Sequence, residues 1–162
     1  WRWQGVPFYV RTGKHMEKRT STITLQFHQP PHLIFDRADQ MPPSTLTIRI
    51  QPEEGISLSF NGKVPGPDVR LGTVDMDFSY ADSFGGRTPE AYETLILDCL
   101  LGDATLYSDS GWIEKSWELL MPVLEAWKAP SSGPVPSYPA GSCGPREADA
   151  LLGAEWRAWA AL

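Results

Sequence analysis

Four segments of the chain alternate between apolar and polar residues, which is the pattern of half-buried β-strands. Their apolar members are Ile23, Leu25 and Phe27; Leu46, Ile48 and Ile50; Ile56, Leu58 and Phe60; and Val74, Met76, Phe78 and Tyr80. Short connectors that contain Gly and Pro favour antiparallel pairing. The segment GVPFYV resembles a further, buried strand, placed at Phe8–Arg11. We therefore expect a mostly antiparallel sheet of at least five strands.

Helical spacing replaces this alternation after the last strand. Thr88, Pro89 and Glu90 predict a helix start, with a hydroxyl cap, a Pro in the first turn and an acid at the positive end of the helix dipole. The apolar stripe that follows consists of Tyr92, Leu95, Ile96, Cys99 and Leu100. Cys99 is therefore expected to be a small core residue.

A second helix is predicted from about Gly111 to Lys128, with a kink at Pro122. The apolar face of this helix comprises Ile113, Trp117, Leu120, Leu124 and Trp127. Residues 129–145 are rich in Pro, Gly and Ser and predict an extended arm, and a terminal helix is expected within residues 146–162, from Arg146 to about Trp159. The fold class is α+β, with one domain over residues 1–162 and helices that cover one face of the sheet.

The opposite face of the predicted sheet is lined by short hydroxyl side chains. They belong to Thr22, Thr24, Thr45, Thr47, Ser57, Ser59 and Ser79, with Arg49, Asp75 and Asp77 among them. Simple exposure to solvent is one interpretation of this face. This face has few lysines, however, whose charge would oppose association, and a flat hydroxyl surface can pack against a copy of itself. We therefore expect a homo-oligomer through this polar face, with a charge pair between Arg49 and Asp77.

Composition narrows the function classes. The 162 residues carry 14 basic and 20 acidic side chains, a net charge of −6 that argues against nucleic-acid binding. The two cysteines and three histidines show no metal-ligand spacing, so no metal site is expected, and nothing near Cys143 suggests an activated thiol. No signal peptide or membrane-spanning apolar run is present, which favours a cytoplasmic protein without membrane contact.

Basic charge is concentrated in one place. The stretch GVPFYVRTGK ends in Arg11 and Lys14, with Gly13 between them, and Arg19 follows after one short charged turn. Two or three cations at a strand end can clamp a phosphate or a carboxylate. The alternative is a sheet end with solvated basic side chains, and composition alone favours that alternative.

Six motifs in order carry a family resemblance. They are WRWQGVPFYVRTGK, STITLQF, LTIRIQPEEGI, PEAYETLILDCLLGDATLY, W-x-x-x-x-P-V-L and AGSCGP. The chain resembles the C-terminal domain portion of the glucose-6-phosphate dehydrogenases. The resemblance implies an NADP-dependent oxidoreductase that oxidises glucose 6-phosphate to 6-phosphogluconolactone in the oxidative pentose phosphate pathway.

Two parts of that family's pattern are not found in the chain. One is the Gly-rich turn of the coenzyme domain, since Gly62, Gly66 and Gly72 lie in a Pro-punctuated loop between strands. The other is the stretch with the substrate-handling His and Lys. We expect a severed C-terminal portion without catalytic residues, inert by itself, whose NADP is bound mainly by an upstream domain. The alternative is a free-standing interaction module that kept the sheet and lost catalysis.

The resemblance also assigns individual residues. Lys14 and Arg19 match positions that contact the sugar phosphate, and Gln51 matches a position that can reach the substrate hydroxyls. Some family members bind a second, structural coenzyme. Arg11, Arg49 and Asp77 match positions of that second site, whereas Thr20, Thr24, Ser57 and Cys143 depart from it. We therefore expect no coenzyme-binding residues in this chain.

Overall fold

The computed structural model describes residues 2–29, 41–85, 90–129, 133–153 and 157–160. They form two compact units, which we name the sheet unit (Trp1–Gly85 with Ser137–Leu162) and the helix unit (Gly86–Pro136). Each unit is described by itself. The expectation of a single domain stays a prediction.

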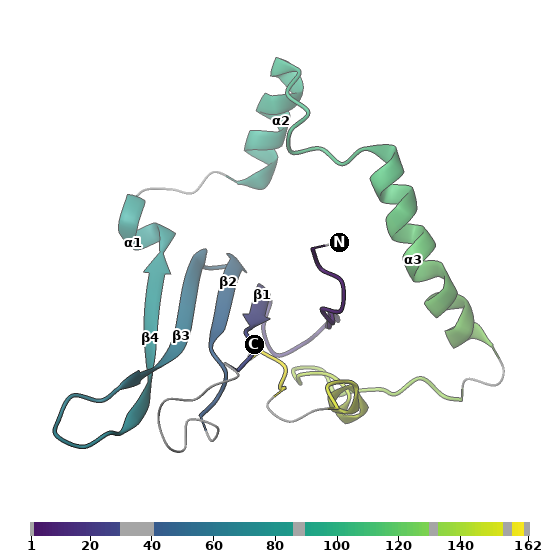
Figure 1. Cartoon of the computed structure of the whole chain (residues 1–162). Coiled ribbons are helices and arrows are strands. Elements are labelled where there is room, and N and C mark those ends of the chain that lie inside the picture. Colours follow the sequence, from purple (N-terminus) through teal and green to yellow (C-terminus); the bar gives the residue numbers. More distant parts are fainter. Residues whose placement is uncertain (1, 30–40, 86–89, 130–132, 154–156, 161–162) are drawn as a thin grey trace. The chain divides into compact units, whose positions relative to one another are not determined.

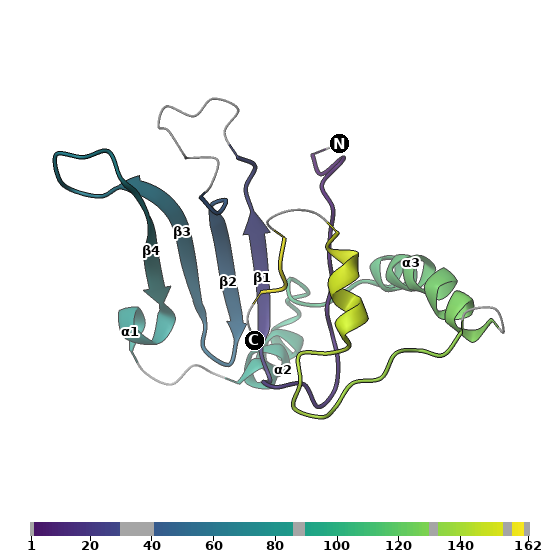
Figure 2. The same ribbon diagram turned by 90° about the horizontal axis from the view of Figure 1, so that it is seen from below.

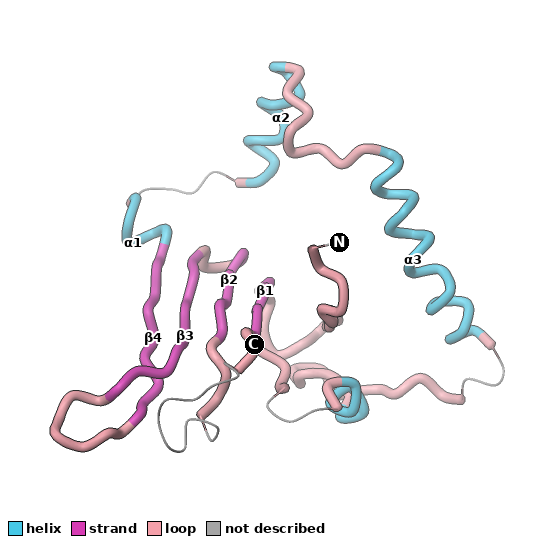
Figure 3. Tube along the Cα trace, in the orientation of Figure 1, coloured by secondary structure: helices cyan, strands magenta, loops and turns pink. Residues whose placement is uncertain are grey.

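The sheet unit contains a four-stranded antiparallel meander in the order β1-β2-β3-β4 (Figures 1 and 3). The strands are β1 (Ser21–Gln26), β2 (Thr45–Gln51), β3 (Gly55–Lys63) and β4 (Leu71–Ser79). Each strand overlaps one of the four alternating segments of the sequence. The α+β class and the antiparallel pairing predicted from the sequence are therefore confirmed.

The register places the apolar and the polar residues on opposite faces. Ile23, Ile48, Ile56 and Phe78 form one cross-strand row, and Thr24, Thr47, Ser57 and Asp77 form the next. Because neighbouring residues of a strand point to opposite faces, the hydroxyl residues share a single surface. We name this surface the polar face, and its composition is the one predicted from the sequence.

The prediction of a fifth strand at Phe8–Arg11 is wrong. The backbone of this segment is outside any strand, and the Phe8 and Val10 side chains are 72% and 82% exposed. Pro7 has no N–H to donate to a ladder. Instead of pairing with the sheet, Tyr9 and Arg11 contact the C-terminal segment through their side chains.

A short helix ends the meander. Helix α1 (Tyr80–Phe84) begins where the Ser79 hydroxyl accepts a hydrogen bond from the Asp82 N–H, so Tyr80 belongs to this helix and not to the last strand. Tyr80, Phe78 and Phe84 form a small aromatic cluster with ring centroids 4.9–6.3 Å apart. The serine cap explains why the strand pattern stops one residue earlier than predicted.

The helix unit contains α2 (Ala91–Leu101) and α3 (Ser110–Lys128). Helix α2 has Glu90 at its N-cap, while Thr88 and Pro89 of the predicted start lie outside the described residues. Helix α3 begins at the side-chain cap of Asp109 and continues through Pro122. The helix predicted from about Gly111 to Lys128 is confirmed with a start one residue earlier, and α2 confirms a helix over the stripe from Tyr92 to Leu100.

The predicted stripe of α2 lies on one face of the helix. Tyr92, Leu95, Ile96, Cys99 and Leu100 border an apolar cavity of about 340 Å³ together with Tyr107. The Tyr107 hydroxyl donates a hydrogen bond to the Leu95 carbonyl at 2.5 Å. Within the helix unit the Cys99 side chain is exposed, so the helix unit by itself does not make it the core residue that the sequence predicts.

The C-terminal part of the sheet unit is mostly irregular. Residues 133–139 contain neither helix nor strand, and the 3-10 helix η3 spans Arg146–Leu151, where the sequence predicts a helix to about Trp159. Gly153 has a left-handed φ of +45°, which ends the helical turn early. Residues 157–160 are extended and run beside the N-terminal segment (Figure 2). No helix in the described part of the chain is long and apolar enough to cross a membrane.

Candidate functional site

Lys14 and Arg19 lie on the connection between the extended N-terminal segment and β1. Bends occupy residues 14, 15, 17 and 18, and Arg19 stands two residues before the first residue of β1. Both side chains are exposed, and in the described part of the chain neither has a hydrogen bond or ion pair. The structure therefore leaves both cations available to an anion.

Gln51 lies beside this connection. Its side-chain amide donates to the Ser21 hydroxyl at 2.9 Å, and its carbonyl accepts a hydrogen bond from the Thr20 hydroxyl at 3.1 Å. Because β1 and β2 are antiparallel, the start of β1 and the end of β2 meet at one edge of the sheet. The structure thus places Gln51 close to the residue that follows Arg19.

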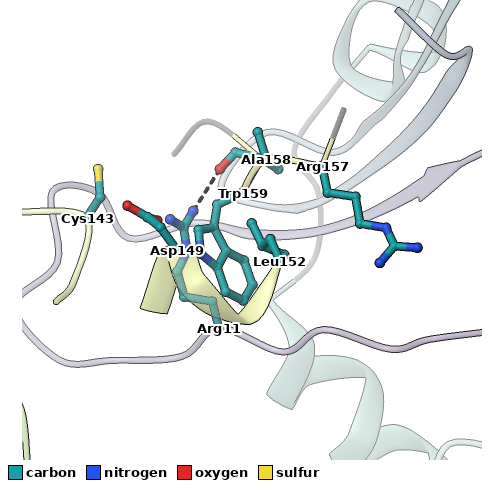
Figure 4. A pocket seen from close by; sticks show the side chains of 8 residues that line it. Arg11, Cys143, Asp149, Leu152, Arg157, Ala158 and Trp159 are labelled. Carbon is teal, nitrogen blue, oxygen red and sulfur yellow. Dashed lines mark hydrogen bonds between the residues drawn. The ribbon is translucent and has the colours of Figure 1, made fainter. Parts of the chain in front are cut away.

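Arg11 is separate from these cations. Its guanidinium lies over the Trp159 ring at 5.2 Å from the centroid and donates to the Ala160 carbonyl at 2.7 Å (Figure 4). A guanidinium that is stacked and hydrogen-bonded in this way is half-buried and already engaged. Of the three cations in the sequence hypothesis, two remain free to bind an anion.

Arg11 and Trp159 border an open cavity of about 420 Å³ between the N-terminal segment and the C-terminal residues. The lining residues are Arg11, Cys143, Asp149, Leu152, Arg157, Ala158, Trp159 and Ala160 (Figure 4). Arg157 stacks on Tyr9 at 5.7 Å and donates to its hydroxyl at 2.9 Å. These contacts hold residues 157–160 against the N-terminal segment.

Cys143 is unsuited to nucleophilic chemistry. Its Sγ donates to the Glu17 carboxylate at 3.3 Å. This hydrogen bond, followed by desolvation and the negative charge of Glu17, raises the pKa of the Cys143 thiol above its ordinary value. The thiolate is the nucleophilic form, so the higher pKa lowers reactivity and agrees with the sequence interpretation.

A charged network crosses the polar face. The Arg49 guanidinium donates to the Ser57 hydroxyl and to the Phe78 carbonyl at 3.3 Å, and it lies 3.5 Å from an Asp77 carboxylate oxygen. Ser57 in turn donates to Asp77. Gly55 permits this arrangement, because a Cβ there would lie 2.5 Å from Arg49 Nη2. The predicted Arg49–Asp77 pair is confirmed, and it joins β2 to β4 across β3.

A metal site requires several ligand side chains close together. In residues 2–29, 41–85, 90–129, 133–153 and 157–160, no three His, Cys, Asp or Glu side chains are grouped to hold a metal ion. The candidate site is therefore the connection that carries Lys14 and Arg19, together with Gln51 at the adjacent sheet edge.

Sequence reasoning missed the part played by the C-terminal residues. Residues 138–142 contact the turn that carries Lys14, and residues 157–160 contact Tyr9 and Arg11. The motif AGSCGP, the last of the six, is the sequence signal for this contact. A Gly- and Pro-rich segment has no periodicity, so the motif alone does not predict which residues it contacts.

Comparison with known proteins identifies the family of the chain. The family profile described as glucose-6-phosphate dehydrogenase, C-terminal domain, matches residues 1–160. The chain belongs to the glucose-6-phosphate dehydrogenase C-terminal domain family. The resemblance inferred from the six motifs is therefore confirmed.

Individual relatives are similar over nearly the whole chain. Glucose-6-phosphate 1-dehydrogenase of Chlamydia pneumoniae is 46% identical over 99% of the chain, and glucose-6-phosphate 1-dehydrogenase 2 of Mycobacterium bovis is 45% identical over 96%. The chain spans 32% and 31% of the lengths of these two relatives, about a third of each.

Solved structures show the same fold. A glucose-6-phosphate dehydrogenase in complex with its substrate glucose-6-phosphate matches with a TM-score of 0.77 and 32% identity, over 92% of this chain and 30% of that one. Glucose-6-phosphate 1-dehydrogenase from Mycobacterium avium matches with a TM-score of 0.71 and 26% identity, over 93% of this chain and 31% of that one.

Proposed function

We propose that the chain is the substrate-binding and oligomerising part of an NADP-dependent dehydrogenase that oxidises glucose 6-phosphate. The reaction would move a hydride from C1 of the sugar to the nicotinamide and yield 6-phosphogluconolactone, the entry to the oxidative pentose phosphate pathway. NADP and the His that acts as base would be held mainly by an upstream domain. This chain would supply the groups that hold the sugar phosphate.

The free cations of Lys14 and Arg19 carry this proposal. Both are exposed and, within the described residues, unpaired, although 20 acidic side chains are present in the chain. A phosphate dianion binds most strongly to donors that are themselves charged, and an ammonium and a guanidinium on one short connection are such donors. Gln51, hydrogen-bonded to Ser21 at the adjacent sheet edge, would reach a sugar hydroxyl.

Arg19→Met tests this function in the full-length protein. The wild-type protein should reduce NADP when glucose 6-phosphate is supplied. In the variant the KM for glucose 6-phosphate should be about 5- to 10-fold higher. This rise corresponds to the loss of roughly 1–1.4 kcal/mol of binding free energy from one exposed charge-assisted contact. Steady-state kinetics with each substrate varied in turn would measure it. Arg70→Met, in the exposed β3–β4 loop, is the matched control and should leave both KM values unchanged.

Two results would count against the function. One is a full-length protein that reduces no NADP with glucose 6-phosphate, which would favour an interaction module. The other is an Arg19→Met variant that behaves like Arg70→Met in the KM for glucose 6-phosphate.

The oligomerising part of the proposal concerns the polar face. At its centre the exposed Thr24 has its Oγ1 3.3 Å from Oγ1 of the half-buried Thr47, and the Arg49–Ser57–Asp77 network lies beside them. The charges of the network neutralise each other within the face, so a second copy could cover them without an unpaired charge. We propose that two copies of the chain associate through this face.

Thr47→Glu should weaken that association. The substitution adds a carboxylate beside Ser57 and Asp77, in a surface that association would remove from water. Sedimentation velocity of the full-length protein over a wide concentration range should show a larger monomer fraction than in the wild type. Ser108→Glu adds the same charge to an exposed loop of the helix unit and is the control. Identical sedimentation of Thr47→Glu and wild type would mean that the polar face is solvated.

We also propose that α2 and α3 cover the apolar face of the sheet in the full-length protein. Ile23, Val74 and Met76 on that face are 51%, 44% and 59% exposed in this structure. The apolar stripes of α2 and α3 are likewise exposed, with Tyr92 at 75% and Trp117 at 56%. Burying such side chains stabilises a fold by about 1.5–3 kcal/mol each, which supports mutual coverage.

A further inference from the structure

The turn that carries Lys14 is held by the C-terminal arm. The Tyr138 hydroxyl donates to the Lys14 carbonyl at 2.9 Å, and the Gly141 N–H donates to the His15 carbonyl at 2.7 Å. The Glu17 N–H donates to the Ser142 carbonyl at 3.1 Å. Three bonds from one short segment therefore reach three of the four residues from 14 to 17.

This turn has a backbone conformation that needs such support. His15 has a left-handed φ of +54°. Among the described residues, every other residue with a left-handed φ is a glycine. A residue with a side chain adopts this conformation at a cost, and it persists where surrounding contacts hold it. The bonds made by Lys14, His15 and Glu17 are contacts of that kind.

Tyr138 reaches the turn through the space left by Gly13. A Cβ at Gly13 would lie 2.7 Å from Tyr138 Oη and 2.9 Å from Met16 Sδ, closer than real side chains approach. The missing side chain at position 13 therefore lets the phenol lie against the backbone just before Lys14. The phenol ring itself is half-buried in the sheet unit.

We propose that Tyr138 is a positioning residue for the sugar phosphate. Its hydroxyl fixes the Lys14 carbonyl and with it the main-chain point from which the flexible ammonium reaches the anion. Because the main chain at Lys14 is already fixed, Lys14 loses less conformational entropy when it binds the phosphate, and the phosphate is bound more tightly. Of the three bonds, this one comes from a side chain, so a substitution can remove it alone. The inference rests on the proposed function of Lys14.

Tyr138→Phe in the full-length protein tests the role. Removal of one hydroxyl should raise the KM for glucose 6-phosphate about 3- to 10-fold, with kcat and the KM for NADP within about twofold of wild type. Gly13→Ala, which displaces the phenol without removing it, should raise the same KM. A tyrosine that only stabilised the fold would change thermal stability without this selective change in KM.

Tyr107→Phe is the matched control. Its hydroxyl also donates to a backbone carbonyl, that of Leu95 at 2.5 Å, but it lies in the helix unit. The same chemical change there should leave the KM for glucose 6-phosphate unaltered. An equal rise in both variants would overturn the proposal, because the effect would then be general.

A double variant separates this inference from the proposed function. If Tyr138 acts through Lys14, Tyr138→Phe should have little further effect on the KM for glucose 6-phosphate once Lys14→Met is present. An undiminished effect in that background would overturn the positioning role and leave the phosphate site standing. A Lys14→Met variant with an unchanged KM for glucose 6-phosphate would overturn the phosphate site and the positioning role together.

Discussion

Lys14→Met in the full-length protein is expected to raise the KM for glucose 6-phosphate roughly 10- to 150-fold, the equivalent of about 1.5–3 kcal/mol for a hydrogen bond to a charged group. The physical reason is the loss of an exposed ammonium that no described residue neutralises. Methionine keeps much of the length of the side chain, so the charge is the main difference. Most of the loss should appear in KM if the phosphate is held equally in the ground and transition states.

Steady-state kinetics with varied glucose 6-phosphate and with varied NADP would measure this effect. The KM for NADP should change little. Lys14→Arg keeps the charge and should recover much of the affinity, while Lys128→Met removes a lysine at the end of α3 and should have no effect. Unaltered constants for glucose 6-phosphate in Lys14→Met would make Lys14 an ordinary solvated side chain.

The combination with Arg19→Met provides a second check. Two cations that bind one phosphate are coupled, because removal of the first changes how the anion sits against the second. The double variant should therefore lose less binding free energy than the sum of the two single losses. Strict additivity would indicate that the two side chains bind at independent places.

The isolated chain of 162 residues is expected to show no NADP reduction with glucose 6-phosphate. Hydride transfer needs the sugar and the nicotinamide held in contact and a base for the hydroxyl proton. In our proposal the base and most of the coenzyme site lie in an upstream domain, so positioning and proton transfer are lost together. The loss should reach the background rate, which is the largest effect expected here.

Formation of NADPH, followed by absorbance, would test this with the purified chain. Circular dichroism should first show the strand and helix signals of a folded chain. The full-length protein at the same molar concentration is the positive control. Turnover by the folded chain above a blank without enzyme would mean that residues within it are catalytic.

Local patterns were sufficient for the regular elements. The alternation around Ile48 and Ile56 predicted β2 and β3, and helical spacing predicted α2 and α3 close to their observed ends. These patterns work because each element repeats its own side-chain period, whatever its neighbours are. The Arg49–Asp77 pair followed from the same periodicity, since both residues fall on one face of adjacent hairpins.

Segments without a period were predicted less well. GVPFYV has the composition of a strand, yet residues 8–11 pair with no strand. An apolar segment joins a sheet only where a neighbouring strand has an unpaired edge, and composition does not encode this. The terminal helix ends at Leu151, and Cys99 is exposed. The neighbour that would make residues 8–11 a strand lies far away in the sequence, whereas the terminal helix ends for a local reason, the left-handed backbone of Gly153.

The sequence by itself determined the four strands of the meander, helices α2 and α3, the polar face and, through its motifs, the family. It also pointed to Lys14 and Arg19 as the basic residues of interest. Only the tertiary structure decided that Arg11 is engaged by Trp159 and that Tyr138 holds the carbonyl of Lys14. Arg11 and Trp159 are separated by 148 positions in the sequence, and Lys14 and Tyr138 by 124. No local periodicity encodes which distant group a side chain will contact.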